Sequence, residues 1–458
     1  MTEELSRRDC LKLAGAVTLG FIGLRMSAMH QGRPAQLGGY GPLVRDPKGR
    51  MDLPAGFSYR ILSEKGQRMD DGLILPGAPD GMCALPLAGG LVALVRNHEL
   101  SPGGGAFGER GELLKAFDKR KLYDAGDGTK ICAGGTTTLV YDPASESVVR
   151  QYLSLAGTTR NCAGGPTPWG SWITCEENVD RAGKNGKKDR QYLCQRDHGY
   201  CFDVPVDAEE PVDPVPLTAM GRFNHEAVAV DPKTGIVYLT EDRGNGLFYR
   251  FIPKTPGKLA DGGVLQALVV TGKPQCDTRN WGTVNVPVGE ELGAEWLTLD
   301  NVEAPEDDLR KRGFEAGAAV FARGEGIWYG DDGIYFACTS GGMSQDGQIF
   351  RYVPGPDESG TRGGTVSLFI EPNDGELIKN GDNLTVSPWG DLVVCEDRSG
   401  DVVRLVGVTP DGACYTFAHS HMRSEFAGAC FSPDGKTLFV NSQGPGITFA
   451  ITGPWREA

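Results

Sequence analysis

The sequence predicts an all-β fold, a six-bladed β-propeller with long insertions between the blades and a few short helices. Three observations lead to this prediction. Six segments share one strand–turn–strand pattern, and the pattern recurs without any alternation of strands and long helices. Glycine, with 66 residues, and proline, with 29, supply the turn chemistry that many short strands need.

The first 30 residues resemble a twin-arginine export signal. Arg7 and Arg8 precede an apolar run at 13–24, which is too short for an ordinary membrane-spanning helix. Cys10 stands where this signal usually has phenylalanine. We therefore expect residues 1–30 to be an export signal read by the twin-arginine machinery. Residues 31–458 are expected to form a single propeller domain, periplasmic or extracellular and monomeric.

Six segments carry the repeat, each with a turn centred on proline or glycine followed by a run rich in β-branched and aromatic residues. Another short apolar run precedes each of them, so each unit is a predicted hairpin. The segments are LPLAGGLVALVRNHE from Leu85, TPWGSWITCEE from Thr167, DPKTGIVYLTED from Asp231, YGDDGIYFACTS from Tyr329, SPWGDLVVCED from Ser387 and SPDGKTLFVNSQ from Ser432.

The remaining segments connect or close the repeat. Long insertions fall at 101–130, 178–221 and 255–322, and the first contains GELLKAFDKRKL, a predicted short helix at 111–122. Two further strand-like runs, at 57–62 and 446–452, are expected to complete one blade from both ends of the chain.

The net charge of −14 argues against a nucleic-acid partner, because phosphate binding needs a basic surface. Twelve cysteines are present, without a CxxC pair at zinc-site spacing. Most lie in apolar runs and are expected to be buried, while Cys194 and Cys201 are candidates for a disulfide in an oxidising compartment.

Acidic residues gather at one end of the predicted hairpins. The start of a hairpin's first strand and the end of its second strand are neighbours, so these ends are expected to meet at one mouth of the channel. The first-strand starts are Asp80, Cys162, Glu226, Glu325 and Asp382 with Asn383. The second-strand ends are Glu99, Glu176 with Glu177, Glu241 with Asp242 and Glu396 with Asp397, and Glu425 lies just ahead of the sixth hairpin.

So many carboxylates at one mouth would repel one another and raise each other's pKa unless cations bind between them. Carboxylate and amide oxygens suit calcium, and a thiolate suits a softer, iron-like or zinc-like ion. The pattern predicts a mixed metal cluster. The alternative for any single acid is a solvated rim residue or a turn cap.

Arg323 lies two residues before Glu325, and residues two apart in a strand point the same way. Its guanidinium is expected to face the cluster, either as a phosphate clamp or as charge balance for the acids. No glycine-rich nucleotide-binding pattern follows a predicted strand and opens a helix, and neither G-x-S-x-G nor H-E-x-x-H occurs in the sequence.

From Leu53 onward the motifs resemble the PhoX-type alkaline phosphatases, a bacterial family. The segments that carry the resemblance are LPAGFSYRIL, DGM at Asp80, NHE at Asn97, TRNCAGGPTPWGSWITCEE, GRFNHEAVAVDP, LTEDR, ARGEGIWY, GDNLTVSPWGDLVVCED and EFAGACFSPDG.

The resemblance implies a six-bladed propeller that holds a ferric iron pair and several calcium ions and hydrolyses phosphomonoesters and some diesters. It implies that Cys162 is the thiolate ligand of iron, that Glu226 and Glu325 ligate on the iron side, and that Arg323 holds the phosphate. The pool of further ligands would be Glu99, Glu176, Glu241, Asp242, Asp382, Asn383, Glu396 and Asp397.

The leading hypothesis is therefore an exported, metal-dependent phosphoesterase acting on small phosphorylated substrates. A calcium-dependent lactonase or esterase on the same architecture is a second hypothesis, which Cys162 and Arg323 disfavour. The third is a propeller that binds a partner without catalysis, since a fold alone does not decide function.

Overall fold

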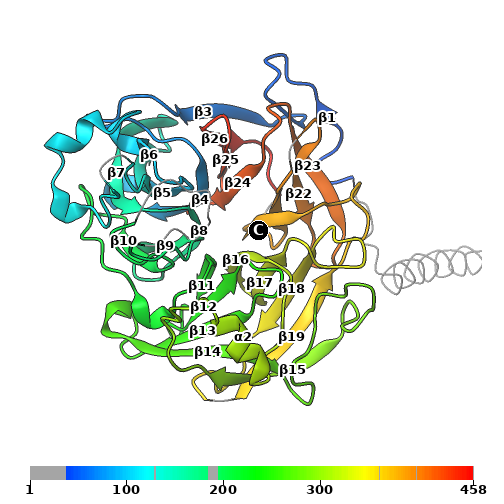
Figure 1. Cartoon of the computed structure of the whole chain (residues 1–458). Coiled ribbons are helices and arrows are strands. Elements are labelled where there is room, and N and C mark those ends of the chain that lie inside the picture. Colours follow the sequence, from blue (N-terminus) through cyan, green and yellow to red (C-terminus); the bar gives the residue numbers. More distant parts are fainter. Residues whose placement is uncertain (1–37, 128–129, 184–193, 361, 399, 457–458) are drawn as a thin grey trace, which may run out of the picture.

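The computed structural model describes residues 38–127, 130–183, 194–360, 362–398 and 400–456, and strands dominate them (Figure 1). The predicted export signal lies outside these residues. In the part described, α2 (Leu309–Glu315) is the one α-helix, and no helix is long and apolar enough to cross a membrane. The predicted helix at 111–122 is instead two 3-10 turns, η3 (Glu112–Ala116) and η4 (Lys119–Lys121). Other 3-10 turns are η1 (Ala88–Gly90), η2 (Gly105–Phe107), η5 (Thr218–Met220) and η6 (Leu259–Asp261).

All six predicted hairpins form, each with an antiparallel pair. The pairs are β4 (Pro79–Pro86) with β5 (Val92–His98), β8 (Asn161–Pro166) with β9 (Ser171–Glu176), β11 (His225–Val230) with β12 (Val237–Glu241), β16 (Gly324–Gly330) with β17 (Gly333–Cys338), β20 (Gly381–Val386) with β21 (Leu392–Glu396), and β24 (Phe426–Phe431) with β25 (Thr437–Ser442). Three of the turns place Gly170, Gly390 and Gly435 at φ between 71° and 89°, a conformation that glycine adopts at little cost.

Further strands extend these hairpins into five sheets within the described residues. The sheet orders are β4-β5-β6-β7, β8-β9-β10, β24-β25-β26-β3, β1-β2-β23-β22-β21-β20 and β11-β12-β13-β14-β15-β19-β18-β17-β16. The added strands are β1 (Leu43–Val44), β2 (Met51–Pro54), β3 (Ser58–Glu64), β6 (Gly134–Asp142), β7 (Ser147–Thr158), β10 (Cys201–Pro205), β13 (Phe248–Pro253), β14 (Gly263–Val270), β15 (Glu291–Thr298), β18 (Gln348–Val353), β19 (Arg362–Ile370), β22 (Val403–Val408), β23 (Cys414–Ser420) and β26 (Ile447–Thr452).

The prediction of a six-bladed propeller is wrong, because the sheets are not six separate blades. The insertion at 255–322 supplies β15, which pairs with β14 on one edge and with β19 on the other. Two hairpin units are thereby joined into a nine-stranded sheet, and two edges that would otherwise be unpaired are covered. The end strands β11 and β16 of that sheet contact each other, so it is a nearly closed barrel beside four smaller, propeller-like sheets.

The predicted pairing of the two chain ends is confirmed, since β26 pairs antiparallel with β3. The first strands of the hairpins, β4, β8, β11, β16, β20 and β24, contact one another in a closed ring, which we call the central ring. Figure 1 shows β4, β8, β11, β16 and β24 nearest the middle of the molecule. The apolar core clusters contain residues of the ring strands together with residues of the strands outside them. In the nine-stranded sheet, for example, the rings of Phe248 and Phe336 stack with centroids 4.3 Å apart.

Candidate metal centre

Each strand of the central ring has a break in register near its start. The breaks fall between Pro79 and Met82, Asn161 and Gly164, His225 and Val228, Gly324 and Ile327, Gly381 and Leu384, and Ala427 and Cys430. The first bulged residues are Asp80, Cys162, Glu226, Glu325, Asp382 and Gly428. A bulge re-aims a side chain and bends its strand. Five chemically functional residues, far apart in the sequence, therefore occupy equivalent positions at one end of the ring.

The last residues of β12 and β21 do not face this centre. Glu396 is fully buried and accepts hydrogen bonds at 2.6 and 2.9 Å from Arg404. Glu241, also fully buried, lies 3.5 Å from Arg310 Nη1. Glu176, at the end of β9, likewise accepts hydrogen bonds away from the centre. These three predicted ligands are instead engaged in structural contacts.

The residue that follows each strand end points the opposite way, as side chains of an extended chain do. Glu177, Asp242 and Asp397 face the centre, and so does Glu99, which follows β5. Burial raises the pKa of Glu177 to about 7; the nearby Arg160 lowers it, while Asp242 and Glu99 raise it. Asp242 and Glu99 therefore lie close enough to Glu177 for their charges to repel its carboxylate.

Two groups of carboxylates could each hold a cation. One oxygen from each of Glu226, Glu325 and Asp382 lies within 4.8 Å of the other two, and the same holds for Asp382, Asp397 and Glu425. Asp382 is common to both groups. Its Oδ1 is buried and has no hydrogen-bond partner among the described residues. A carboxylate placed in this way is suited to bridge two ions.

Burial is the largest cause that raises the pKa of Asp80, Glu226, Glu325 and Asp382 well above the usual range, and repulsion between neighbouring carboxylates adds to it. Burial, then a hydrogen bond with Asp397 and repulsion from neighbouring carboxylates, raise the pKa of Glu425 to about 9. Ionised carboxylates in such a site cost free energy unless positive charge compensates them.

Two arginines supply part of that charge. Arg323 pairs with Asp242 at 2.7 Å, with Glu325 at 2.8 Å and with Asp397 at 3.9 Å. It reaches the centre through a turn, at φ 55°, and not through the strand alternation that the sequence predicted.

Arg160, which the sequence analysis did not single out, has φ 51° and pairs with Glu99 at 2.6 Å and with Glu177. The signal was present in the sequence, because Arg160 stands two residues before Cys162 just as Arg323 stands two before Glu325.

Cys162 lies beside the acids but in neither carboxylate group. Its buried Sγ is 3.4 Å from the carbonyl oxygen of His225 and 3.5 Å from that of Glu226. Burial and then the Glu226 carboxylate raise the pKa of the thiol. Asn383, the second bulged residue of β20, accepts a hydrogen bond from the Gly428 N–H at 3.2 Å and thus faces the next strand of the ring.

The residues present fit a cluster of cations. In the described part of the chain, nine mutually repelling carboxylates face two arginines at this centre. The carboxylates are Asp80, Glu99, Glu177, Glu226, Asp242, Glu325, Asp382, Asp397 and Glu425. Carboxylate oxygens with an adjacent thiol are ligands for hard cations and for a softer transition metal.

Residues 38–446 match the family model described as alkaline phosphatase PhoX. The chain belongs to the PhoX alkaline phosphatase family. Members of this family are metal-dependent phosphatases, and this PhoX protein is accordingly a phosphoric ester hydrolase that acts on phosphorylated substrates.

The structure of Pseudomonas fluorescens PhoX in complex with vanadate, a transition state analogue, has a TM-score of 0.66 and 18% identity to this chain, covering 92% of it and 98% of the other. At that identity the likeness shows the fold alone. A gluconolactonase of Xanthomonas campestris has a TM-score of only 0.38 and 12% identity, covering 92% of this chain and 99% of the other. No curated protein sequence matches the chain.

Proposed function

We propose that this PhoX protein hydrolyses phosphomonoesters, and some diesters, at a cluster of iron and calcium ions held at the bulged end of the central ring. The observation that carries the proposal is the pair of carboxylate groups joined by Asp382, with Arg323 at their edge. Bound cations would neutralise the negative charge that develops on the phosphoryl oxygens.

The ligands we propose are those that the ring brings together. Glu226, Glu325 and Asp382 would bind on the iron side with the Cys162 thiolate, whose raised pKa a soft cation would reverse. The bulges hold these side chains on strands and not on free loops, which favours a fixed geometry. Asp242, Asp397, Glu425, Glu99, Glu177 and Asp80 would supply the remaining oxygens, chiefly to calcium.

Arg323 would hold the substrate phosphate. Its guanidinium is positioned by Asp242 and Glu325, and its side chain remains 37% exposed, so a phosphate can reach it from solvent. A planar guanidinium can donate two parallel hydrogen bonds to phosphate oxygens, and it stays charged at alkaline pH.

Replacing Arg323 by alanine tests this role. We expect kcat/KM for a phosphomonoester to fall by about 100-fold or more in Arg323→Ala, as for the loss of a group that stabilises transition-state charge. Iron and calcium content should be unchanged, and inhibition by inorganic phosphate should be weakened. Arg423→Ala is the matched control, since Arg423 also has a positive φ (57°) ahead of a central strand but pairs with the exposed Asp401. Wild-type activity in Arg323→Ala would remove Arg323 from the mechanism.

We further propose that the protein is exported by the twin-arginine route and acts outside the cytoplasm as a monomer. Residues 1–30 support the export route, with Arg7 and Arg8 ahead of a short apolar run. Changing both arginines to lysine should retain the protein in the cytoplasm, which cell fractionation would detect. Export of the double variant at the wild-type level would refute this route.

A further inference from the structure

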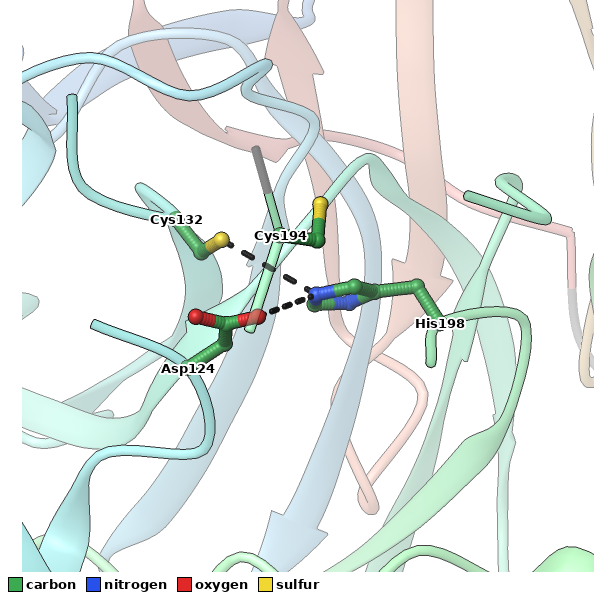
Figure 2. A group of neighbouring side chains, drawn as sticks. All are labelled: Asp124, Cys132, Cys194 and His198. Atoms are coloured by element: carbon green, nitrogen blue, oxygen red, sulfur yellow. Dashed lines mark hydrogen bonds and ion pairs between the residues drawn. The ribbon is translucent and has the colours of Figure 1, made fainter. Parts of the chain in front are cut away.

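A second group of metal-ligating side chains lies away from the central ring. Asp124 and Cys132 come from the segment that precedes β6, and Cys194 and His198 come from the segment that precedes β10. One ligand atom from each of the four lies within 4.8 Å of those of the others. All four side chains are at most 1% exposed. Figure 2 shows them converging from the two segments, with His198 aimed between Asp124 and Cys132.

The imidazole of His198 is held in a defined orientation. Its Nδ1 is 2.6 Å from Glu176 Oε1, and its Nε2 is 3.2 Å from Asp124 Oδ2 and 3.8 Å from Cys132 Sγ. Glu176 also accepts a hydrogen bond from the Gly199 N–H at 2.9 Å, so its carboxylate is fixed. A buried carboxylate that accepts Nδ1–H leaves Nε2 as the ligand atom, the usual arrangement around a metal-binding histidine.

Asp124 is fixed in the same manner. Its Oδ2 accepts hydrogen bonds from the N–H groups of Gln195 at 2.7 Å and Arg196 at 2.9 Å, and its Oδ1 accepts one from Gly126 at 2.7 Å. These bonds tie the segment that carries Cys132 to the segment that carries Cys194. The group therefore lies where two insertions meet.

The two cysteines pack differently from the others in the described chain. Cys132 and Cys194 form an apolar cluster of their own, whereas Cys83 and Cys338 belong to larger clusters between the sheets. The candidate disulfide between Cys194 and Cys201 is not brought together either, since Cys201 Sγ lies 3.6 Å from Cys175 Sγ instead. Cys132 and Cys194 thus pack against each other, outside the larger hydrophobic clusters.

We propose that Asp124, Cys132, Cys194 and His198 bind a structural transition-metal ion of the zinc class, independent of the ions at the central ring. Two thiolates, one imidazole and one carboxylate complete a four-ligand set, and the complete burial of the ligands leaves no open position for a substrate. Both cysteines bind as thiolates and His198 binds through an unprotonated Nε2, so the protons that these groups carry pass to solvent when the ion binds. In the described residues, the two insertions that the ion cross-links contain no β-strand between η4 and β6 or between β9 and β10.

The first test is made on the full-length protein as exported. After dialysis against a mild chelator, we expect one equivalent of a zinc-class metal per chain, in Cys162→Ala as well as in the wild type. Replacement of this ion by Co(II) should give a thiolate-to-cobalt absorption that also persists in Cys162→Ala. Peptide mapping without reduction should recover Cys132 and Cys194 as free thiols once the metal is removed. Absence of the metal from the wild type, or a Cys132–Cys194 disulfide, would overturn the proposal.

Variants then assign the ligands. Cys132→Ser and His198→Ala should lose the zinc-class equivalent while they retain iron and calcium. Cys276→Ser, a buried cysteine in another cluster, is the control and should retain it. If Cys132→Ser does not fold, His198→Cys serves in its place, because a third thiolate should keep the metal and change the Co(II) spectrum. Unchanged metal content and spectrum in the variants that fold would place the ion elsewhere and refute the assignment.

Discussion

Neighbouring acids at the end of β21 should respond to substitution in opposite ways. Glu396 is fully buried and makes a two-bonded ion pair with Arg404, whose side chain is 8% exposed. Asp397, the next residue, is 39% exposed and lies in a carboxylate group at the centre. We predict that Glu396→Gln destabilises the fold and leaves metal binding intact. Asp397→Asn should leave the stability of the fold unchanged and impair metal binding.

The expected loss of folding stability in Glu396→Gln follows from the buried ion pair. Removal of one charge from a buried ion pair costs about 3–5 kcal/mol, because the partner stays buried and unpaired. Glutamine keeps an acceptor for the Lys379 N–H, which Glu396 accepts at 2.7 Å, so the lower end of that range applies. An unfolding entropy of about 2.1 cal/mol/K per residue over 458 residues is about 1 kcal/mol/K, and Tm should fall by about 3 °C.

The assay is calorimetric melting of the metal-depleted proteins, combined with metal content and phosphatase activity of the loaded proteins. Asp397→Asn should melt like the wild type when depleted, and should lose metal and activity when loaded. If Glu396→Gln instead keeps its Tm and loses metal, Glu396 is the ligand and the proposed orientation of the strand ends is wrong.

Two further predictions concern the ring and its charge. Gly326→Ala should lower activity and metal content, because its Cβ would lie 2.7 Å from the Asp382 carbonyl oxygen and displace the strand that carries Asp382. Gly103→Ala is the control and should lower neither, because its Cβ would have no neighbour closer than 3.7 Å. Equal activity of the two variants would contradict the close packing of β16 and β20. In the metal-depleted protein the pKa of Glu177 is raised to about 7 and that of Glu425 to about 9, so the folded state holds protons at these two residues that the unfolded state has released above its pKa of about 4.3. Its stability should therefore fall as pH rises from about 4.5 to about 9, and metal loading should flatten that dependence; a stability that rises with pH in urea titrations would show that these acids are not crowded.

The hairpins and the acidic end could be predicted from the sequence because their determinants are local. Turn residues such as Gly390 and the alternating apolar runs fix each strand pair without reference to the rest of the chain. The sheet count could not be predicted, because β15 lies in an insertion whose pairing with both β14 and β19 depends on tertiary contacts.

The orientation of the acids at the strand ends could not be predicted from the sequence either. Alternation requires that Glu241 and Asp242 point opposite ways, but it does not say which one faces the centre. The bulge at the start of each central strand adds a residue, so counting from the turn gives no answer either. Only the buried partners, such as Arg310 beside Glu241, identify the structural member of the pair.

The most direct test of the metal centre is elemental analysis, with an absorption spectrum, of the protein purified from the compartment to which it is exported. We expect iron together with calcium, and a thiolate-to-ferric visible band that disappears in Cys162→Ala. A protein that hydrolyses phosphomonoesters at full rate with neither iron nor calcium bound would contradict it.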